Sequence, residues 1–458
     1  MAATLCTMMK TRIDRILVVL LTLSFLSMIY HDYMDFDSSI VTRSWSVETA
    51  TATESDAIFN FQYDNAFTNF SLPEWLENFI HNQSIATHND IISDPNERFL
   101  VLSCHKYGGG LPEKCGGLTD RLRFLPYFIW IAHQTGRKLL IKYTKPYPLE
   151  EFFVPPDDGL DWRLPDEQLE NYKKEWEYYG NRSEENYKSQ RRMPWHVSIH
   201  EAPWNETRFI FVNNNLNKVG HLIQRLTGSQ EKLMWPGLFR RMFKPSKALG
   251  GVIESLVKES GLVPGQYGAA HIRAMYPPGK RGFKGKLNTT KAFKDNIGDN
   301  AANCVVKAMP ETSHIYVATD TSEILDYLLH ESSTWASNRT MRASREKMAL
   351  DAHTGPPAKI VARPDYNVSS LHFDESNFPG LSGKAPPQAY FQIFVDLWML
   401  AHSKCISQGL GGFGHFASML SGNHLSCRNR HRDYVLGVLD SCPSPSELKM
   451  MKRNVARF

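Results

Sequence analysis

Several common signatures of metal, repeat and nucleic-acid proteins are missing from this sequence of 458 residues. It contains no Cys-x-x-Cys and no His-x-His, the spacings typical of structural zinc sites, so we expect no such site. No internal period of about 20 to 50 residues recurs, which excludes solenoids and propellers. The formal net charge is only +4, with basic and acidic residues interspersed, so nothing predicts nucleic acid as a partner.

Long hydrophobic runs are also scarce, and the one at residues 16–30 carries no charge. Basic residues precede it and acidic residues follow it, so the positive-inside rule predicts a cytoplasmic tail at 1–15 and a transmembrane signal anchor at 16–30. The run is shorter than the roughly 20 residues that a bilayer prefers, so a cleaved signal peptide is the competing interpretation. Large and acidic side chains at 30–36 disfavour cleavage. We therefore expect a single-pass type II protein of the Golgi or endoplasmic reticulum membrane.

Two other features agree with a lumenal location. The first is a set of seven Asn-x-Ser/Thr sequons, at Asn69, Asn82, Asn181, Asn205, Asn288, Asn338 and Asn367. The second is cysteine usage, because an even six remain beyond Cys6 in the predicted tail: Cys104, Cys115, Cys304, Cys405, Cys427 and Cys442. Disulfides are therefore expected, and six cysteines allow about 15 pairings. Cys104 with Cys115, and Cys427 with Cys442, would close short loops.

The rest of the chain divides by composition. Residues 31–97 are polar and rich in Ser and Thr, which predicts a lumenal stem that is partly helical around residues 73–81. The part from Arg98 onward is too long for one ordinary core. We therefore predict an N-terminal domain at 98–262 and a C-terminal domain at 263–458, with their junction within 236–265.

The start of the first domain predicts a strand, a glycine-rich loop, a helix and a second strand. FLVLSC and KLLIKY are short apolar runs suited to buried strands, and apolar residues recur at helical spacing from Leu118 to Ala132. Pro126 is expected to kink this helix and Gly136 to end it. Further buried strands are predicted near Phe209, Ala270, Val317, Val361 and Ile406. Such βαβ units build parallel sheets, so the predicted fold class is α/β, with two doubly wound Rossmann-like domains.

Ligands of such sheets bind beyond the carboxyl ends of the strands, and two of these ends are rich in glycine. The first is a loop that includes Gly108, Gly109, Gly116 and Gly117. It leads through Asp120 into a helix whose amides favour an anion, although a flexible loop closed by a disulfide is an equal alternative. The second follows a strand that ends at Ser407 and includes Gly411, Gly412, Phe413 and Gly414. It presents helix amides to an anion in the same way.

Two other strand ends carry charged side chains. His271-Ile272-Arg273 delivers a guanidinium to the sheet edge, where a planar fork binds phosphate, and an ion pair to a core carboxylate is the alternative. Thr319-Asp320 follows HIYVA. Asp320 either accepts hydrogen bonds from a guanine edge or caps the next helix.

In this order and spacing, these four strand ends resemble the GDP-fucosyltransferase superfamily, which includes protein O-fucosyltransferases and α1,6- and α1,2-fucosyltransferases. GGLTDRLRFLPYFIWIAHQTGRKLLI is similar to the first glycine loop and helix of the family, and GAAHIRAMYP to its His-x-Arg motif. YVATDTSEIL and ISQGLGGFGHFASML are similar to its second and third motifs. The resemblance implies a GT-B fold that binds GDP-fucose, without a cofactor, with Arg273 on the β-phosphate and His271 and Asp320 around GDP.

The resemblance implies inverting displacement at the fucose anomeric carbon, with Arg273 neutralising the charge that develops on the leaving phosphate. Asp120 is one of the carboxylates nearest the donor loop and is our candidate base. No metal is expected, since the single Asp-x-Asp, at residues 35–37, lies beside the anchor. Ala274 and Tyr276 stand where many relatives carry a second Arg and an Asp, which leaves the glycan or protein acceptor open. A catalytically inactive GDP- or glycan-binding relative is the alternative, and a Golgi sulfotransferase is a distant third.

Overall fold

The structure is a computed structural model. It describes residues 72–84, 91–104, 117–165, 176–178, 206–213, 231–273, 291–332, 335, 358–363, 386–409, 412–421 and 427–428, all of which fall in one compact unit. The predicted tail and anchor lie outside these ranges. Within the ranges, no helix is both long enough and apolar enough to cross a membrane.

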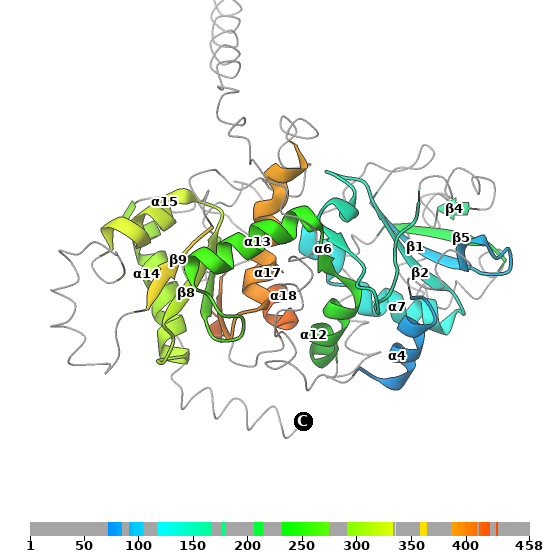
Figure 1. The fold of residues 1–458 in the computed structure, drawn as a ribbon, viewed down its shortest axis with the longest axis horizontal. Coiled ribbons are helices and arrows are strands. Elements are labelled where there is room, and N and C mark those ends of the chain that lie inside the picture. Colours follow the sequence, from blue (N-terminus) through cyan, green and yellow to red (C-terminus); the bar gives the residue numbers. More distant parts are fainter. Residues whose placement is uncertain are drawn as a thin grey trace, which may run out of the picture. The chain divides into compact units, whose positions relative to one another are not determined.

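The first half of the chain builds a four-stranded parallel sheet (Figure 1). Its strands are β1 (Phe99–Cys104), β2 (Lys138–Tyr143), β4 (Trp176–Tyr178) and β5 (Phe209–Asn213), in the order β2-β1-β5-β4. Alternate residues of β1 enter different cores: Leu100 joins the core that holds the helices, while Phe99 faces the opposite side and stacks on Phe209 at 4.7 Å. This alternation is the period of two expected of a strand buried on both faces.

The predicted single helix after the glycine loop is two helices. These are α6 (Leu118–Leu122) and α7 (Leu125–Gln134), separated at Arg123 and Phe124. Pro126 lies in the first turn of α7, where its missing amide hydrogen costs nothing, so it starts a helix instead of kinking one. Gly136, with φ of 61°, follows the end of α7 as predicted.

The second half builds a five-stranded parallel sheet. Its strands are β7 (Gly268–Ile272), β8 (His314–Thr319), β9 (Lys359–Val361), β10 (Cys405–Gln408) and β11 (Cys427–Arg428), in the order β11-β10-β7-β8-β9. One face carries α14 (Lys291–Ala308) and α15 (Ser322–Asp326), which continues as the π-helix η4 (Tyr327–Glu331). The other face carries α17 (Phe391–Ala401), preceded by η6 (Pro387–Tyr390), and α18 (Gly412–Leu420). The α/β class with parallel sheets is thus confirmed.

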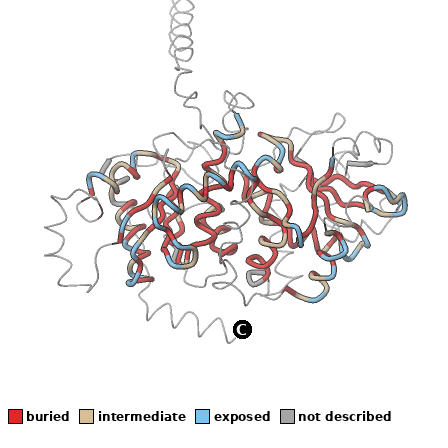
Figure 2. The backbone as a smooth tube through the Cα atoms, in the orientation of Figure 1, coloured by how far each residue is buried: buried red, intermediate tan, exposed pale blue. Residues whose placement is uncertain are grey.

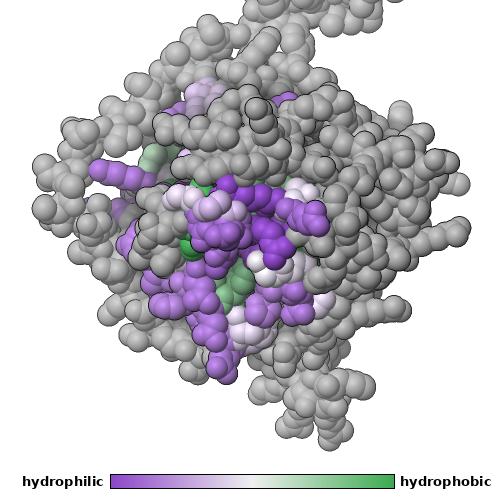
Figure 3. Space-filling view, turned by 90° about the vertical axis from the view of Figure 1, so that its right-hand side faces the viewer, coloured by the Kyte–Doolittle hydropathy of each residue, from purple (hydrophilic) through white to green (hydrophobic). Residues whose placement is uncertain are grey.

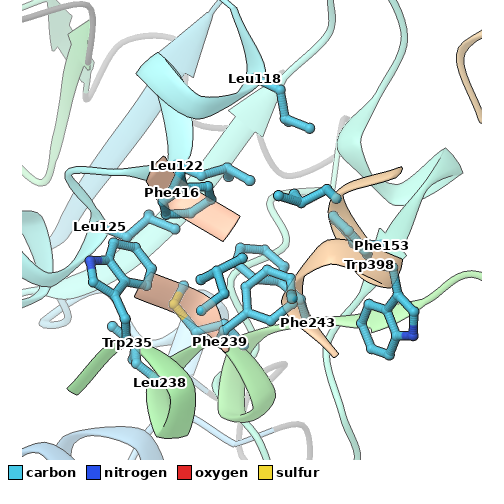
Figure 4. Close-up of a cluster of buried hydrophobic side chains, with 14 of the residues drawn as sticks. Leu118, Leu122, Leu125, Phe153, Trp235, Leu238, Phe239, Phe243, Trp398 and Phe416 are labelled. Atoms are coloured by element: carbon cyan, nitrogen blue, oxygen red, sulfur yellow. The ribbon is translucent and has the colours of Figure 1, made fainter. Parts of the chain in front are cut away.

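A continuous apolar core joins the helices of both halves. The segment predicted to be a domain junction forms α12 (Glu231–Met242) and α13 (Lys247–Ser260), and their inner faces are buried (Figure 2). Strand β6 (Lys244–Pro245) lies between these helices in the chain and pairs antiparallel with β3 (Phe153–Val154), which follows the short helix η2 (Leu149–Glu151). Phe152 stacks on Phe394 at 4.0 Å, and Trp235 meets Phe416 edge to face at 5.0 Å. Figure 4 shows this cluster, with side chains from α6, α7, α12, α17 and α18 around Phe153 and Phe243.

Part of the predicted stem also lies in this core. Helix α4 (Glu74–His81) is present where a helix was predicted, and its Leu76 and Ile80 are fully buried. The carboxamide of Gln83 donates to Leu139 O and accepts from the Leu139 amide, which ties the end of α4 to the edge strand β2. The folded part therefore includes residues on the N-terminal side of Arg98.

The described surface is mainly polar. Figure 3 shows the side that faces right in Figure 1, where the described residues are mostly hydrophilic with small hydrophobic areas between them. Val263, 46% exposed, is the one exposed large hydrophobic residue within the described ranges. Asn82 is the sequon asparagine that falls within the described residues, and it is exposed.

Candidate functional site

The strand order of the second sheet reverses between β7 and β10. The chain runs from β7 outward to β8 and β9, then returns to the other side of β7 as β10 and β11. Beside such a reversal the connections leave toward opposite faces of the sheet, which opens a crevice at the carboxyl ends of the two central strands. Two of the predicted motifs end at these strands, so the fold itself makes this edge the candidate site.

His271 lies at the centre of this edge. It pairs in register with Gln408 of β10 and Ala318 of β8, and the Gly409 amide donates to its carbonyl at 2.9 Å. Its ring is buried and lies 5.4 Å from the ring of Phe413, near the start of α18. The strand that carries His-x-Arg and the glycine-rich helix are therefore in direct contact.

Gly414 allows this contact. A Cβ at this position would lie 2.6 Å from His271 Nδ1 and 3.0 Å from its Cβ, closer than real side chains approach. Only glycine lets the first turn of α18 come this near to the imidazole. Among the predicted glycines that the structure describes, Gly414 must therefore be glycine because any side chain there would collide with His271.

Arg273 comes two residues after His271, just beyond the end of β7, and is half-buried. Asp320 occupies the equivalent place after β8 and is also half-buried. The N-cap residue of α15 is Thr321, so Asp320 does not hold the capping position that was its alternative role. Parallel pairing of β7 with β8 brings these two charged residues to the same edge.

Thr319 and Ser407 lie on the other face of the sheet. Their register partners are Ile272 and Ala270, which belong to the core under α14. The Thr319 hydroxyl accepts a hydrogen bond from the Thr321 amide at 3.3 Å, and Ser407 is fully buried. These two predicted residues therefore face away from His271.

Helix α6 brings the first glycine motif to the same place. A Cβ on Gly412 would lie 3.2 Å from the Thr119 hydroxyl, so the beginnings of α6 and α18 nearly touch. Gly117 is the N-cap residue of α6. Asp120, the candidate base, is half-buried and lies 3.8 Å from Arg123 in an ion pair one turn along.

Two polar residues of this edge, Thr119 and Gln408, were not among the predicted site residues, although Thr119 belongs to the sequence that leads from the first glycine loop into α6. Both are buried, at 8% and 5% exposure, and each adjoins a residue that was predicted. The available signal was position: side chains alternate along a strand, which places Gln408 on the His271 face, and Thr119 lies in the first turn of α6. Their uncharged side chains gave no chemical signal of their own.

A buried ionic network fixes the helix beneath this edge. Arg363, just after β9, donates to Asp396 of α17 at 2.8 Å, and the Tyr316 hydroxyl donates to the same carboxylate at 2.6 Å. Burial, and then the negative charge of Asp396, raise the pKa of Tyr316 well above its usual value. Asp396 is the single charged residue in the apolar sequence FQIFVDLWMLA, and this was a signal that sequence reasoning did not use.

The remaining predicted residues, Gly108, Gly109, Gly116 and Gly411, lie outside the described residues, as does Ala274. Within the described ranges, no group of three or more His, Cys, Asp or Glu side chains is arranged to hold a metal ion.

No known protein-family profile matches the chain, and no curated protein sequence matches it. Several solved structures are similar to it. A variant of Arabidopsis thaliana FUT1 in complex with GDP has a TM-score of 0.45 at 12% identity, over 83% of this chain and 85% of its own. NodZ, a Bradyrhizobium fucosyltransferase, has a TM-score of 0.40 at 14% identity, over 75% and 98%. POFUT1 in complex with GDP-fucose has a TM-score of 0.36 at 10% identity, over 72% and 94%. NodZ is described as a fucosyltransferase, and the other two structures contain GDP or GDP-fucose.

Proposed function

We propose that the chain transfers fucose from GDP-fucose to a hydroxyl group of a glycan or protein, as an inverting glycosyltransferase of the GT-B type. The observation that carries this proposal is the meeting of three motifs at one switch point. His271-x-Arg273, Thr319-Asp320 and the glycine turn at 412–414 are far apart in sequence, yet their strand ends lie at one sheet edge. If the three segments resembled the family motifs only by chance, nothing would require their strand ends to meet at one edge of the sheet.

The roles follow from chemistry. Arg273 binds the β-phosphate, because a guanidinium at the end of a buried strand offers two parallel donors to phosphate oxygens. The amides that begin α18 face the same anion, and His271 and Asp320 contact the nucleotide. Each of these groups lies on a strand or helix or directly follows one, which keeps them in place before the substrate arrives.

The reaction breaks one bond and forms one. The acceptor hydroxyl oxygen attacks the fucose anomeric carbon from the side opposite GDP, and the bond between that carbon and the β-phosphate oxygen breaks. GDP leaves with the bonding electrons, so negative charge grows beside Arg273. The hydroxyl proton passes to a base, and Asp120 is our candidate, held near the start of α6 by its ion pair with Arg123.

Several parts of the proposal concern the whole protein. We place the reaction in the lumen of the Golgi or endoplasmic reticulum, with the membrane anchor at 16–30, because the sequons and the charge pattern favour that location. We also propose that the reaction needs no metal, with cationic side chains neutralising the leaving group.

Arg273 provides the test. Arg273→Ala should lower GDP-fucose turnover about 100-fold, or about 3 kcal/mol in activation free energy, since it removes a contact that strengthens in the transition state. Arg273→Lys keeps the charge but loses the planar fork, so it should recover little activity. Turnover by the lumenal part, with a chelator present, is measured alongside the melting temperature.

The matched control is Arg241→Ala, because Arg241 belongs to α12 and pairs with Glu77 and Asp158. It should leave turnover near normal. Near-normal turnover by folded Arg273→Ala would refute the donor site. Tight GDP-fucose binding by the native chain without turnover on any glycan or peptide acceptor would instead favour the inactive relative.

A further inference from the structure

The sequon at Asn82 joins the end of a helix to a fully buried residue. Asn82 is the C-cap residue of α4 and is exposed, so its side chain has room for a bulky, soluble group. The next residue, Gln83, has no exposed surface, and Ser84 forms an antiparallel bridge with Leu160. One sequon therefore combines an accessible asparagine with two residues that are built into the fold.

Gln83 is held between two segments that follow it in the chain. Its carboxamide donates to Leu139 O and to Asp161 O, and it accepts from the Leu139 amide at 2.9 Å. Its carbonyl accepts from the Asp161 amide at 2.8 Å. We call these four hydrogen bonds the Gln83 clasp. All of them must break before Gln83 can reach solvent.

The clasp conflicts with glycosylation of the folded chain. The transferring enzyme has to bind both the asparagine and the serine of a sequon, so the residue between them must also be accessible. Chain order removes the conflict, because Leu139 follows Gln83 by 56 residues and Asp161 by 78. At a synthesis rate of about 5 to 20 residues per second, the sequon precedes Leu139 by roughly 3 to 11 s. During that time the clasp has no partner to close on.

We propose that Asn82 carries an N-linked oligosaccharide, transferred before the Gln83 clasp closes. The side-chain nitrogen of Asn82 attacks the anomeric carbon of an oligosaccharide carried on a lipid diphosphate. A carbon–nitrogen bond forms, the bond from that carbon to the diphosphate oxygen breaks, and the lipid diphosphate leaves with the bonding electrons. The amide loses one proton. This modification requires the lumenal location proposed above and rests on it.

The position keeps the sugar away from the candidate site. The clasp holds Asn82 beside the start of β2, where Lys138 Nζ lies 3.4 Å from Asn82 O. Strands β1 and β2 are parallel and in register, so the glycine loop after β1 leaves from the opposite end of this sheet. At about 3.3 Å per residue, strands of six residues separate the two ends by about 20 Å. Asn82→Gln should therefore leave turnover of GDP-fucose unchanged.

Isotope labelling tests the site. The full chain is made in eukaryotic cells and treated with peptide N-glycosidase in heavy-oxygen water, which converts each occupied asparagine to a labelled aspartate. Trypsin leaves Asn69 and Asn82 together on residues 44–98, so chymotrypsin is added to cut after Phe79. We expect a label at Asn82. Labels at other sequons with none at Asn82 would overturn this proposal alone, whereas a chain without any label would overturn the lumenal location as well.

The order of events is tested on full chains made in cells treated with an inhibitor of lipid-linked oligosaccharide synthesis and purified in the folded state. They are incubated with oligosaccharyltransferase and its lipid-linked donor, beside a peptide of residues 78–88. The native chain should be modified at Asn82 about 100-fold more slowly than the peptide, because transfer must await opening of the clasp. Leu76→Ala loosens α4 without changing the sequon and should be modified faster than the native chain. Exposed Glu74→Ala is the matched control and should behave like the native chain.

Two results would contradict this order. One is modification of the folded native chain as fast as the peptide, which would show that the clasp does not block transfer. The other is a Leu76→Ala chain that melts at a lower temperature yet is modified no faster than the native chain. If Leu76→Ala is not recovered folded, Gln83→Ala gives the same comparison, since Asn-Ala-Ser is still a sequon and the side-chain bonds of the clasp are removed.

Discussion

At the scale of single residues, the candidate site depends on how closely backbone approaches a side chain. Gly414 lies against the His271 ring, and Gly251, in the middle of α13, has nothing within 4 Å of its would-be Cβ. The same substitution therefore has opposite expected effects at the two positions. This contrast separates a steric role from the general effect of glycine on a helix.

Gly414→Ala should push the His271 ring out of place and weaken GDP binding in a protein that still folds. Gly251→Ala should leave GDP binding unchanged and raise stability by about 0.5 to 1 kcal/mol, because alanine favours the helix. GDP affinity and urea unfolding are measured for both. Equal GDP affinity in the two variants would mean that the contact with His271 does not shape the site.

His402 is a second residue with a measurable consequence. It ends α17, fully enclosed, and its Nδ1 donates to Trp398 O at 2.7 Å. Burial, with a smaller contribution from Arg240, lowers its pKa from 6.5 to about 3. The His402 imidazole is therefore neutral in the folded chain above about pH 3.

This predicts a loss of stability in acid. Below pH 6.5 the unfolded chain binds a proton at His402 and the folded chain does not until about pH 3. Unfolding is therefore favoured by up to about 1.4 kcal/mol for each pH unit in that window. His402→Gln, compared with the native chain by urea unfolding between pH 7 and 4.5, should flatten the slope by about one proton. An unchanged slope would assign the acid sensitivity to other groups.

Much of the site was predictable at this scale because charge and strand ends are local features. His271, Arg273 and Asp320 each follow an apolar strand, and parallel strands must end at the same edge. The sequence alone did not predict which face of the sheet each of these residues occupies. Thr319 and Ser407 belong to the α14 side because the cores below them are built by segments distant in sequence. The ion pair between Arg363 and Asp396 escaped prediction for the same reason.

At the scale of elements, the strands were predicted more reliably than the helices that join them. The runs for β1, β2, β5, β7, β8, β9 and β10 are short, apolar and bounded by polar residues, so local composition was enough. Strands β4 and β11 have too few residues to show a pattern. The proline in α7 was misjudged because its effect depends on whether it lies inside a helix or begins one.

Helix α4 gives the prediction that belongs to this scale. Leu76→Ala should lower the free energy of unfolding by about 2 to 5 kcal/mol, because it opens a cavity in the main core. Glu74→Ala, exposed on the same helix, should change it by less than about 0.5 kcal/mol. Urea unfolding measures both. A chain beginning at Arg98 that is as stable as one beginning at Phe61 would show that α4 is dispensable.

At the scale of the whole molecule, the two sheets share one core. Buried residues of β1, α7, α12, α17 and α18 form a single apolar cluster that includes side chains from both halves. Aromatic pairs such as Phe152 with Phe394 cross from one half to the other. The halves are therefore not independent folding units in the energetic sense.

The described fold should consequently unfold in one cooperative transition. Calorimetry of a chain beginning at Phe61 should give one peak whose calorimetric and van't Hoff enthalpies agree. Fluorescence and circular dichroism should report the same midpoint. Two resolved peaks, or one half surviving proteolysis after the other has melted, would contradict a shared core.

The shared core also limits how such a chain can be recombined. A chimaera that joins the first half of the chain to the second half of another protein would leave Trp235 without Phe416 and Phe153 without Trp398. Exchanging loops on a preserved scaffold therefore disturbs the fold less than shuffling halves. In an engineering campaign, the crossover points to avoid are those that separate α12 from α17 and α18.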